Sequence, residues 1–461
     1  METSHQDHLF SMLHHYCSLL SLILSTAMHI LIFFSNYHPM YHLIPTFITL
    51  LFHRLIFSTP QIRIIDFSCL KPDKHLRVPI ASLLEHFNLV KRFDKESIAF
   101  MTKVITSSGI GEETHLPPAL RLIPVSPTHE DTIQESHMLF FPTLDELFAK
   151  TKVSPQEIDL LVVNCSGFCP SPSLSSIVVN RYNMRSDVKN YNISGMGCSA
   201  GVLGIDIANR FLMRRRERAY ALVVSTEIVS VGWYNGKDQR KLLLNCLFRM
   251  GCAAVLLTNQ RQTGTLQPKY RLTHLLRTQN AYDDSAYNSA SREEDDEGIT
   301  GFSIQRHIGK AVADLVTSHL RLLGPMILPW EEKFKYVMYR LLHKKYVPNF
   351  AKAMKHLCIP SSSQTLIKTA GKGLGLHENA LEAALATLHR YGNQSSSSML
   401  YQMAYLEAKG KIKKGDRVLQ LGIGSGLKCN SLVLECVRDF ENDLKANPWG
   451  DCLHQYPACM H

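Results

Sequence analysis

The chain has 461 residues, of which 45% are apolar, so it can bury one large core or two fused ones. Its formal net charge of +10 suits an anionic ligand or a membrane surface. Nucleic acid is a poor match, because the densest basic run, Arg214 to Arg218, is short and contains no aromatic residue.

The chain contains twelve cysteines, which raises the question of disulfides or zinc. The N-terminal apolar region is not followed by a cleavage site of small residues, and no paired C-x-x-C spacing occurs. Reduced thiols in contact with the cytosol are therefore the better interpretation, and no metal site is predicted.

Residues 1–60 differ in composition from the rest, with one arginine, no lysine and many histidines. Tyr16 to Phe34 is about long enough to cross a bilayer core. Tyr41 to Phe57 is shorter and contains Pro45, so it is either a second span or an interfacial segment. A signal peptide is the competing interpretation, but the basic n-region is missing. We expect a membrane anchor.

Beyond Pro60, strand-like and helix-like stretches alternate, which is typical of an α/β protein. Linkers are weakly marked at Pro117-Pro118, at Pro124 to Pro127 and at Asn280 to Gly298. The last of these contains the acidic run Glu293 to Glu297, which is most simply a solvated loop.

A cysteine surrounded by small residues follows at the centre of the chain. Leu160 to Asn164 and Asp187 to Ile193 have strand composition, whereas Ala200 to Met213 has helical apolar spacing, so Cys198 lies on a strand-to-helix turn. Free N–H groups and the helix dipole would favour a thiolate there, and the small neighbours leave room for a bulky acyl chain. The alternative is a buried, inert cysteine.

A second unusual segment, Leu388 to Ser398, precedes an amphipathic run from Met399 to Lys409. His389 lies four residues before Asn393, so the two would share one side of a helical turn. A capping role for the next helix is the alternative for Asn393.

The segment Val418 to Gly426 looks like a strand followed by a glycine-rich nucleotide loop. A dinucleotide fingerprint should open a βαβ unit with an acidic residue about twenty positions later. Only about 35 residues remain after this segment, and no second strand is evident, so a nucleotide site is not predicted.

Several further motifs occur in order along the chain. They are Ile65-Asp66-Phe67-Ser68-Cys69-Leu70-Lys71-Pro72, Val163-Asn164-Cys165-Ser166-Gly167, Ser225-Thr226-Glu227, Asn245-Cys246-Leu247-Phe248-Arg249-Met250-Gly251 and Gly424-Ser425-Gly426-Leu427-Lys428-Cys429-Asn430-Ser431. With the two segments above, they make the chain resemble the plant 3-ketoacyl-CoA synthases, the membrane-bound condensing enzymes of very-long-chain fatty-acid elongation. These belong to a thiolase-like and chalcone-synthase-like group, and the resemblance runs from about Ile62 to Tyr456.

The resemblance implies a thiolase-like α/β fold of five layers, αβαβα, made of two similar halves. We assign residues 61–270 to the half with the nucleophilic cysteine and residues 271–461 to the half with histidine and asparagine. The glycines of Val418 to Gly426 would then let backbone approach pantetheine or an acyl group.

The implied reaction is a decarboxylative condensation. Cys198 takes the acyl group from a long-chain acyl-CoA, and malonyl-CoA then loses carbon dioxide and attacks the acyl-enzyme to give a 3-ketoacyl-CoA. Asn393 occupies the position of the family's asparagine donor to the thioester oxygen. His389 would orient the site, and His356 fills a family histidine position where a structural role is the alternative. No metal or redox cofactor is implied, since both CoA esters are substrates.

Two residues depart from the family pattern. Pro360, followed by Ser361 to Ser363, replaces a His-Ala-Gly-Gly segment that contains the catalytic histidine of chalcone-synthase-like enzymes, and Gln279 replaces a second histidine. Proline offers no donor, and losing one oxyanion donor typically slows a reaction about a hundred- to a thousand-fold. Either His356 has taken the role, or the chain is an impaired member that binds and regulates active elongase subunits. A polyketide-type or acyl-carrier-protein condensing enzyme is disfavoured by the expected anchor.

The resemblance also implies an environment and partners. We expect an endoplasmic reticulum membrane protein with its catalytic body in the cytosol. A homodimer or a heterodimer with other condensing enzymes is expected, together with contacts to the reductases and dehydratase of elongation.

Overall fold

The computed structural model describes residues 61–457, except 262–266, 345, 347 and 440–443, together with residues 26–28, 30, 32 and 45–47. Contacts group the chain into two units, Met1–Pro60 and Gln61–His461. The predicted anchor segments Tyr16 to Phe34 and Tyr41 to Phe57 lie almost wholly outside the described residues. Within the described residues, no helix combines the length and the hydropathy that a membrane span requires.

The larger unit is built on one sheet, which has nine strands in the described part of the chain. In spatial order they are β3 (Lys189–Ile193), β2 (Ile158–Asn164), β4 (Tyr220–Thr226), β5 (Cys252–Thr258), β1 (Arg63–Cys69), β6 (Tyr270–Gln279), β11 (Lys428–Cys436), β10 (Arg417–Gly424) and β9 (His356–Cys358). The first five form one half-sheet and the last four the other. The two half-sheets join only where Arg63 and Ile64 of β1 pair with Arg271 and Tyr270 of β6.

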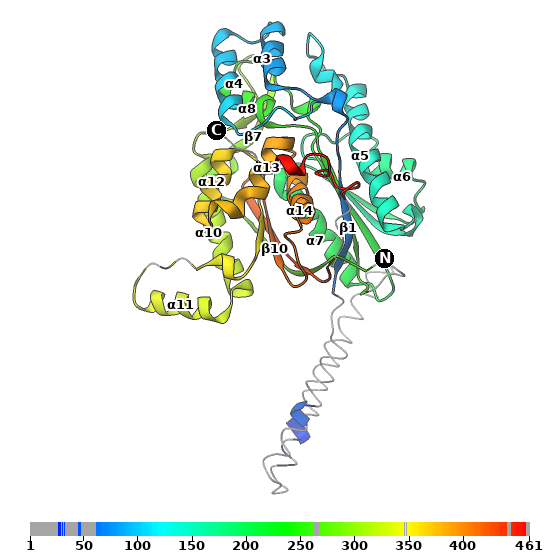
Figure 1. Ribbon diagram of the computed structural model, residues 1–461, viewed down its shortest axis with the longest axis vertical. Helices are drawn as coiled ribbons and strands as arrows, with labels where there is room; N and C mark the ends of the chain where they lie inside the picture. The colour runs from blue at the N-terminus through cyan, green and yellow to red at the C-terminus, as the bar shows by residue number, and fades with distance from the viewer. Residues whose placement is uncertain are drawn as a thin grey trace. The chain divides into compact units, whose positions relative to one another are not determined.

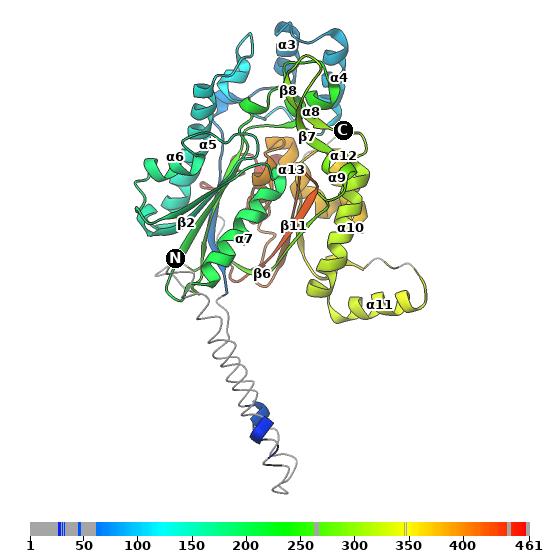
Figure 2. The same ribbon diagram turned by 180° about the vertical axis from the view of Figure 1, so that it is seen from behind.

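Helices cover both half-sheets and fill the space between them. On the outer face of the first half-sheet lie α5 (His129–Thr151) and α6 (Leu174–Arg181), and on that of the second lie α10 (Ile308–Ile327) and α12 (Gln364–Gly373) (Figures 1 and 2). Between the half-sheets lie α7 (Ala200–Met213) and α14 (Ser398–Ala408). The resulting order, helix–sheet–helix–sheet–helix, is the one that the family resemblance implied.

The remaining helices surround this core. They are α3 (Ile80–Leu89), α4 (Lys95–Ser107), α8 (Gln239–Leu247), α9 (Asp284–Tyr287), α11 (Trp330–Leu341) and α13 (Glu382–Tyr391). A small antiparallel hairpin of β7 (Ala290–Glu294) and β8 (Thr300–Ile304) packs beside α8.

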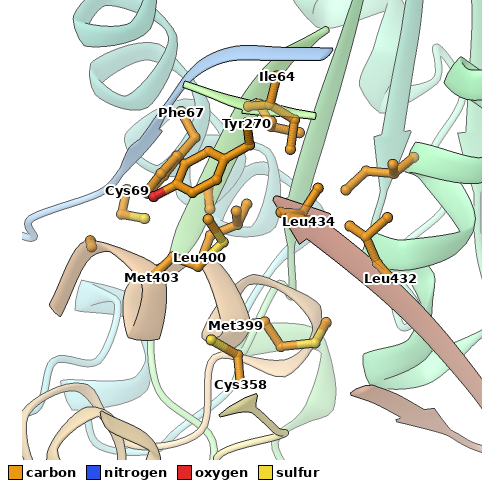
Figure 3. Close-up of a cluster of buried hydrophobic side chains, with 14 of the residues drawn as sticks. Ile64, Phe67, Cys69, Tyr270, Cys358, Met399, Leu400, Met403, Leu432 and Leu434 are labelled. Carbon is orange, nitrogen blue, oxygen red and sulfur yellow. The ribbon is translucent and has the colours of Figure 1, made fainter. Parts of the chain in front are cut away.

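The central apolar cluster joins the two half-sheets through α14. Met399, Leu400 and Met403 of this helix belong to the same cluster of buried side chains as Ile64 of β1 and Leu434 of β11 (Figure 3). All eleven residues of α14 are buried. The amphipathic character predicted for this run is therefore wrong, because its polar side chains are bonded inside the protein rather than exposed to water.

The helices, strands and linkers expected from the sequence can be compared with those of the structure. The predicted helix Ala200 to Met213 and the strands before it are confirmed as α7, β2 and β3. The linker predicted at Asn280 to Gly298 is wrong in part, since it contains α9 and β7. Two of its acidic residues are also bonded, because Asp295 accepts from Tyr234 Oη and Glu293 accepts from Lys241 Nζ at 3.3 Å, whereas Glu294, Asp296 and Glu297 are exposed.

The glycine-rich segment after Val418 does have a second strand, contrary to expectation. The strands β10 and β11 form an antiparallel hairpin in which Gly424 pairs with Lys428. A dinucleotide fold would instead need a helix and a parallel strand after the loop. This hairpin therefore differs in topology from the opening of a dinucleotide fold.

Candidate active site

Cys198 lies where β3 ends and α7 begins, in the 3₁₀ turn Gly197–Ser199. The φ of Gly197 is +55°, and a Cβ atom at this position would lie 2.8 Å from the backbone nitrogen of Ser425 in the β10–β11 turn. Only glycine combines this dihedral with so close an approach. Glycine at position 197 therefore allows the cysteine turn to contact the β10–β11 hairpin directly.

Asn393, between α13 and α14, comes to the same place from the second half of the chain. Its N–H donates to Leu247 O and its carbonyl accepts from Arg249 N, each at 3.0 Å, so its backbone is fixed on both sides. Its side-chain oxygen accepts from Ser395 N at 2.9 Å. No hydrogen bond among the described residues engages Asn393 Nδ2, so this NH₂ group can donate to a ligand.

Ser395 connects the two halves of the site. Its Oγ lies 3.5 Å from Cys198 Sγ and 3.2 Å from Glu227 Oε2. A serine hydroxyl has one proton to donate but can also accept. When it donates to the carboxylate it accepts from the thiol, so the three groups form a hydrogen-bonded chain from Cys198 to Glu227. The φ of Ser395 is +55°, a conformation that few non-glycine residues adopt.

Glu227 follows directly after β4 and is held by the segment after β2. Its carboxylate accepts from Gly167 N at 2.7 Å, from Ser166 N at 3.3 Å and from Cys165 Sγ at 3.5 Å. Burial raises the pKa of Glu227 although these donors oppose the shift. A carboxylate with a raised pKa can accept a proton near neutral pH more readily than an exposed one.

The position of Cys198 at a helix N-terminus predicts a lowered thiol pKa, but the structure gives a raised one. Although Cys198 is only partly buried by surface area, desolvation by the surrounding protein raises its pKa to about 11. When Ser395 instead donates its proton to the sulfur, that hydrogen bond lowers the thiol pKa, and the charge of Glu227 raises it. The expected low-pKa thiol is therefore wrong for the unliganded site, and Cys198 needs a base to become a nucleophile.

Sequence reasoning had assigned no role to Glu227 or Ser395. Both lie in motifs that carry the family resemblance. The position of Glu227 at the end of a buried strand is a signal from which a functional role could have been predicted. Their proximity was not predictable, because 168 residues separate them along the chain.

The contacts of His389 lie outside this hydrogen-bonded chain. Its Nδ1 lies 3.0 Å from Tyr456 Oη, and its ring packs edge-on against Tyr456. Gly111 lies on its other side, where a Cβ atom would be 2.6 Å from His389 Cε1. The helix α13 ends at Tyr391, and Gly392 has a φ of +72°, so His389 and Asn393 do not share a helical turn. That part of the expectation is wrong.

His356 is the first residue of β9, and Pro360 lies two residues beyond the end of this strand. His356 pairs with Val418 in the parallel β9–β10 register, which ends at Cys358 and Gln420 and directs the following residues, Ile359 and Pro360, toward the Gly422 end of β10. A Cβ atom on Gly422 would lie 3.1 Å from Cys198 O, so Pro360 is at the active-site end. Four strand residues span about 13 Å, which keeps His356 away from the thiol.

The contacts of His356 fit this remote position. Its Nε2 lies 3.3 Å from Asp416 Oδ2, and burial lowers its pKa although Asp416 opposes the shift. The catalytic role assigned to His356 stays a prediction, as does that of His389.

Gln279, the second departure from the family pattern, is exposed at the end of β6 and pairs with Lys428 of β11. Lys428 in turn pairs with Gly424, next to the β10–β11 turn that touches the cysteine turn. Both departures therefore lie toward the side of the sheet that carries Cys198.

Comparisons with known proteins agree with this arrangement. Residues 55–346 match the family described as "FAE1/Type III polyketide synthase-like protein". Residues 351–436 match the C-terminal region of "3-Oxoacyl-[acyl-carrier-protein (ACP)] synthase III". The two matches together cover both halves of the fold.

Among individual proteins, 3-ketoacyl-CoA synthase 6 of Arabidopsis thaliana is 40% identical over 409 residues, which cover 87% of this chain and 82% of that protein. The crystal structure of a fungal type III polyketide synthase, ORAS, superposes with a TM-score of 0.66 at 16% identity, covering 81% of this chain and 99% of that one. PKS-I from the brown alga Ectocarpus siliculosus gives a TM-score of 0.64 at 17% identity, covering 82% of this chain and 99% of that one. The solved structures support the fold alone.

Proposed function

The chain belongs to the plant 3-ketoacyl-CoA synthases and is an acyl-transferring condensing enzyme of thiolase-like fold, and from this premise we propose that it elongates very-long-chain fatty acids. Its reaction is the decarboxylative condensation of a long-chain acyl-CoA with malonyl-CoA to a 3-ketoacyl-CoA. The observation that carries the proposal is the meeting of Cys198 with the Asn393–Ser395 segment from the other half of the chain.

In the first half-reaction the thiol of Cys198 gives up its proton and its sulfur attacks the acyl thioester. With a pKa of about 11, the thiol is almost wholly protonated at neutral pH. Ser395 accepts this proton while passing its own to Glu227. The C–S bond to coenzyme A breaks, and the leaving thiolate takes the proton back from Glu227. Cys198 is left as the acyl-enzyme, and the carboxylate is regenerated.

In the second half-reaction malonyl-CoA loses carbon dioxide, and the electron pair of the broken C–C bond moves toward the thioester oxygen. Asn393 Nδ2, which lacks a partner among the described residues, donates to that oxygen. The resulting enolate carbon attacks the acyl carbonyl, and the bond to Cys198 Sγ breaks. The Cys198 thiolate that leaves takes up one proton from solvent water, passed through Glu227 and Ser395, and the thiol is restored.

An impaired, regulatory family member is the second candidate, and Pro360 is the observation that favours it. Proline stands at the end of β9 that points to the cysteine turn, where the resemblance implies a histidine donor. In this reading the chain pairs with an active condensing enzyme and changes its output. Dimer formation, contacts with the other elongase subunits and residence in the endoplasmic reticulum membrane belong to both candidates.

The decisive experiment uses membranes from cells that express the full-length chain. They are supplied with a series of saturated and monounsaturated acyl-CoAs and labelled malonyl-CoA, and 3-ketoacyl-CoA formation is measured. Product from the wild type but not from Cys198→Ala supports the synthase. Absence of product with every acyl-CoA, together with co-purification of an active synthase whose product lengths change, supports the regulatory candidate instead.

A further inference from the structure

The helix α11 turns an apolar face outward. Trp330, Phe334, Val337 and Leu341 are 83%, 65%, 53% and 68% exposed, and their spacing of four, three and four residues places them on one side of the helix. A surface helix of a globular protein normally buries such a stripe. In both ribbon views α11 lies beyond α10, at the edge of the larger unit opposite α5 and α6 (Figures 1 and 2).

The polar side of α11 is the side that contacts the protein. The Glu332 side chain is 1% exposed, accepts from Tyr346 Oη at 2.6 Å and from Asn349 N at 3.0 Å, and pairs with Lys352 at 3.0 Å. These bonds lower the pKa of Glu332 to about 2, so its carboxylate is charged at every physiological pH. The helix is thus attached to the protein through a buried carboxylate. Its polar side contacts the protein and its apolar side is exposed, which is the reverse of a surface helix in a soluble protein.

Basic residues border the apolar face. At 100° per residue, Lys333 and Arg340 fall on one edge of the stripe, whereas Glu331 falls nearest the other edge and pairs with Lys335 at 2.6 Å. The ammonium of Lys333 lies 5.1 Å from the centre of the Trp330 ring. An apolar stripe that carries a tryptophan and has lysine and arginine along one border is typical of a helix that lies in a membrane interface. This cationic border complements anionic headgroups.

We propose that α11 is an interfacial helix that inserts its apolar face, Trp330, Phe334, Val337 and Leu341, into the surface of an anionic lipid bilayer. This contact is separate from the N-terminal anchor and comes from the catalytic body itself. It would hold the body in one orientation at the membrane surface. A second copy of the chain is the competing occupant, but an antiparallel pair of these faces would bring the basic Lys333 and Arg340 borders together, which like charges oppose.

The test uses the full-length chain in vesicles of phosphatidylcholine and phosphatidylserine. Trp233 and Trp449 are 9% and 0% exposed, so lipids with brominated acyl chains, which quench tryptophan on contact, report mainly on Trp330. Trp330→Phe gives the background. We expect strong quenching that Phe334→Glu with Leu341→Glu removes, whereas Tyr282→Glu, at an 84% exposed aromatic elsewhere, leaves it unchanged.

Three outcomes would overturn the proposal. Equal fluorescence in brominated and ordinary vesicles would show that α11 does not reach the acyl chains. A blue shift that rises with the protein-to-lipid ratio without quenching would assign the face to a second copy. Equal quenching in pure phosphatidylcholine would refute the preference for anionic lipid. All substituted positions are exposed, so circular dichroism of each variant should match the wild type, and quenching can be compared directly.

Discussion

Replacing Glu227 by glutamine separates two opposite effects of this residue on Cys198. As a negative charge, Glu227 raises the pKa of the thiol, so removing the charge alone would increase the thiolate fraction and speed acylation. As the end of the hydrogen-bonded chain through Ser395, Glu227 accepts the thiol proton, so removing it would slow acylation. The sign of the change therefore distinguishes the two roles.

The magnitude follows from the thiol pKa and from typical base catalysis. With a pKa of about 11, only about one Cys198 in a thousand is ionised at pH 8. A positioned general base contributes about 10²- to 10⁴-fold to such a step. We expect Glu227→Gln to slow acylation within this range, and Ser395→Ala to have a similar effect because it interrupts the same chain.

The pH dependence provides an independent check. A carboxylate base must be ionised, and burial raises the pKa of Glu227, so acylation by the wild type should fall as pH decreases through that raised pKa. In Glu227→Gln this acidic limb should disappear, and the rate should rise with pH toward the thiol pKa near 11.

The assay is single-turnover transfer of labelled acyl-CoA to the purified full-length protein, followed by isolation of the Cys198 peptide. Glu294→Gln, at an exposed acidic position on the β7–β8 hairpin, is the matched control. Faster acylation in Glu227→Gln, or an unchanged rate with an unchanged pH profile, would refute the proton relay.

Four other substitutions or treatments give separate results. Asn393→Ala should slow decarboxylative condensation about 10²- to 10³-fold with acylation retained, and equal loss of both steps would contradict its donor role. Converting Pro360 to Ser363 into His-Ala-Gly-Gly should raise labelled malonyl-CoA incorporation by up to about a hundred-fold. Because glycine replaces the capping Ser363 of α12, the change should cost only about 0.3 kcal/mol in a denaturant titration. His356→Ala should leave condensation unchanged, and its loss would show that this histidine acts in the reaction despite its distance. Alkaline carbonate should leave the full-length protein in the membrane pellet, and its release would exclude a spanning anchor.

The sequence was sufficient where a local pattern determines a structure. Apolar spacing fixes α7 at Ala200–Met213, and the small residues around Cys198 identify the turn before it. The order of the motifs was enough for the family, and hence for the layered fold. The glycine at position 197 is a residue-level reason for that turn, because its dihedral and its contact with Ser425 both exclude a side chain.

The sequence was insufficient where the surroundings of a side chain are formed by residues far away along the chain. Gln402 and Glu407 made α14 look amphipathic, but the first bonds the backbone of Ile359 and the second bonds Tyr270, so both are satisfied in the core. The thiol pKa was misjudged for the same reason, since desolvation by the surrounding protein is the largest cause acting on it and raises it. The position of Pro360 relative to Cys198 becomes visible only through the β9–β10 register.

The place of β1 in the sheet has a consequence for biosynthesis. This strand is the first of the catalytic body to leave the ribosome, yet its neighbours are β5, which ends at Thr258, and β6, which ends at Gln279. At about 5–20 residues per second, translation takes about 10–40 s to reach β5. During that time the apolar stretch Ile64 to Phe67 has no native strand to pair with. Because such unpaired edges aggregate readily, nascent chains that stall before Thr258 should depend on chaperones far more than the finished protein does.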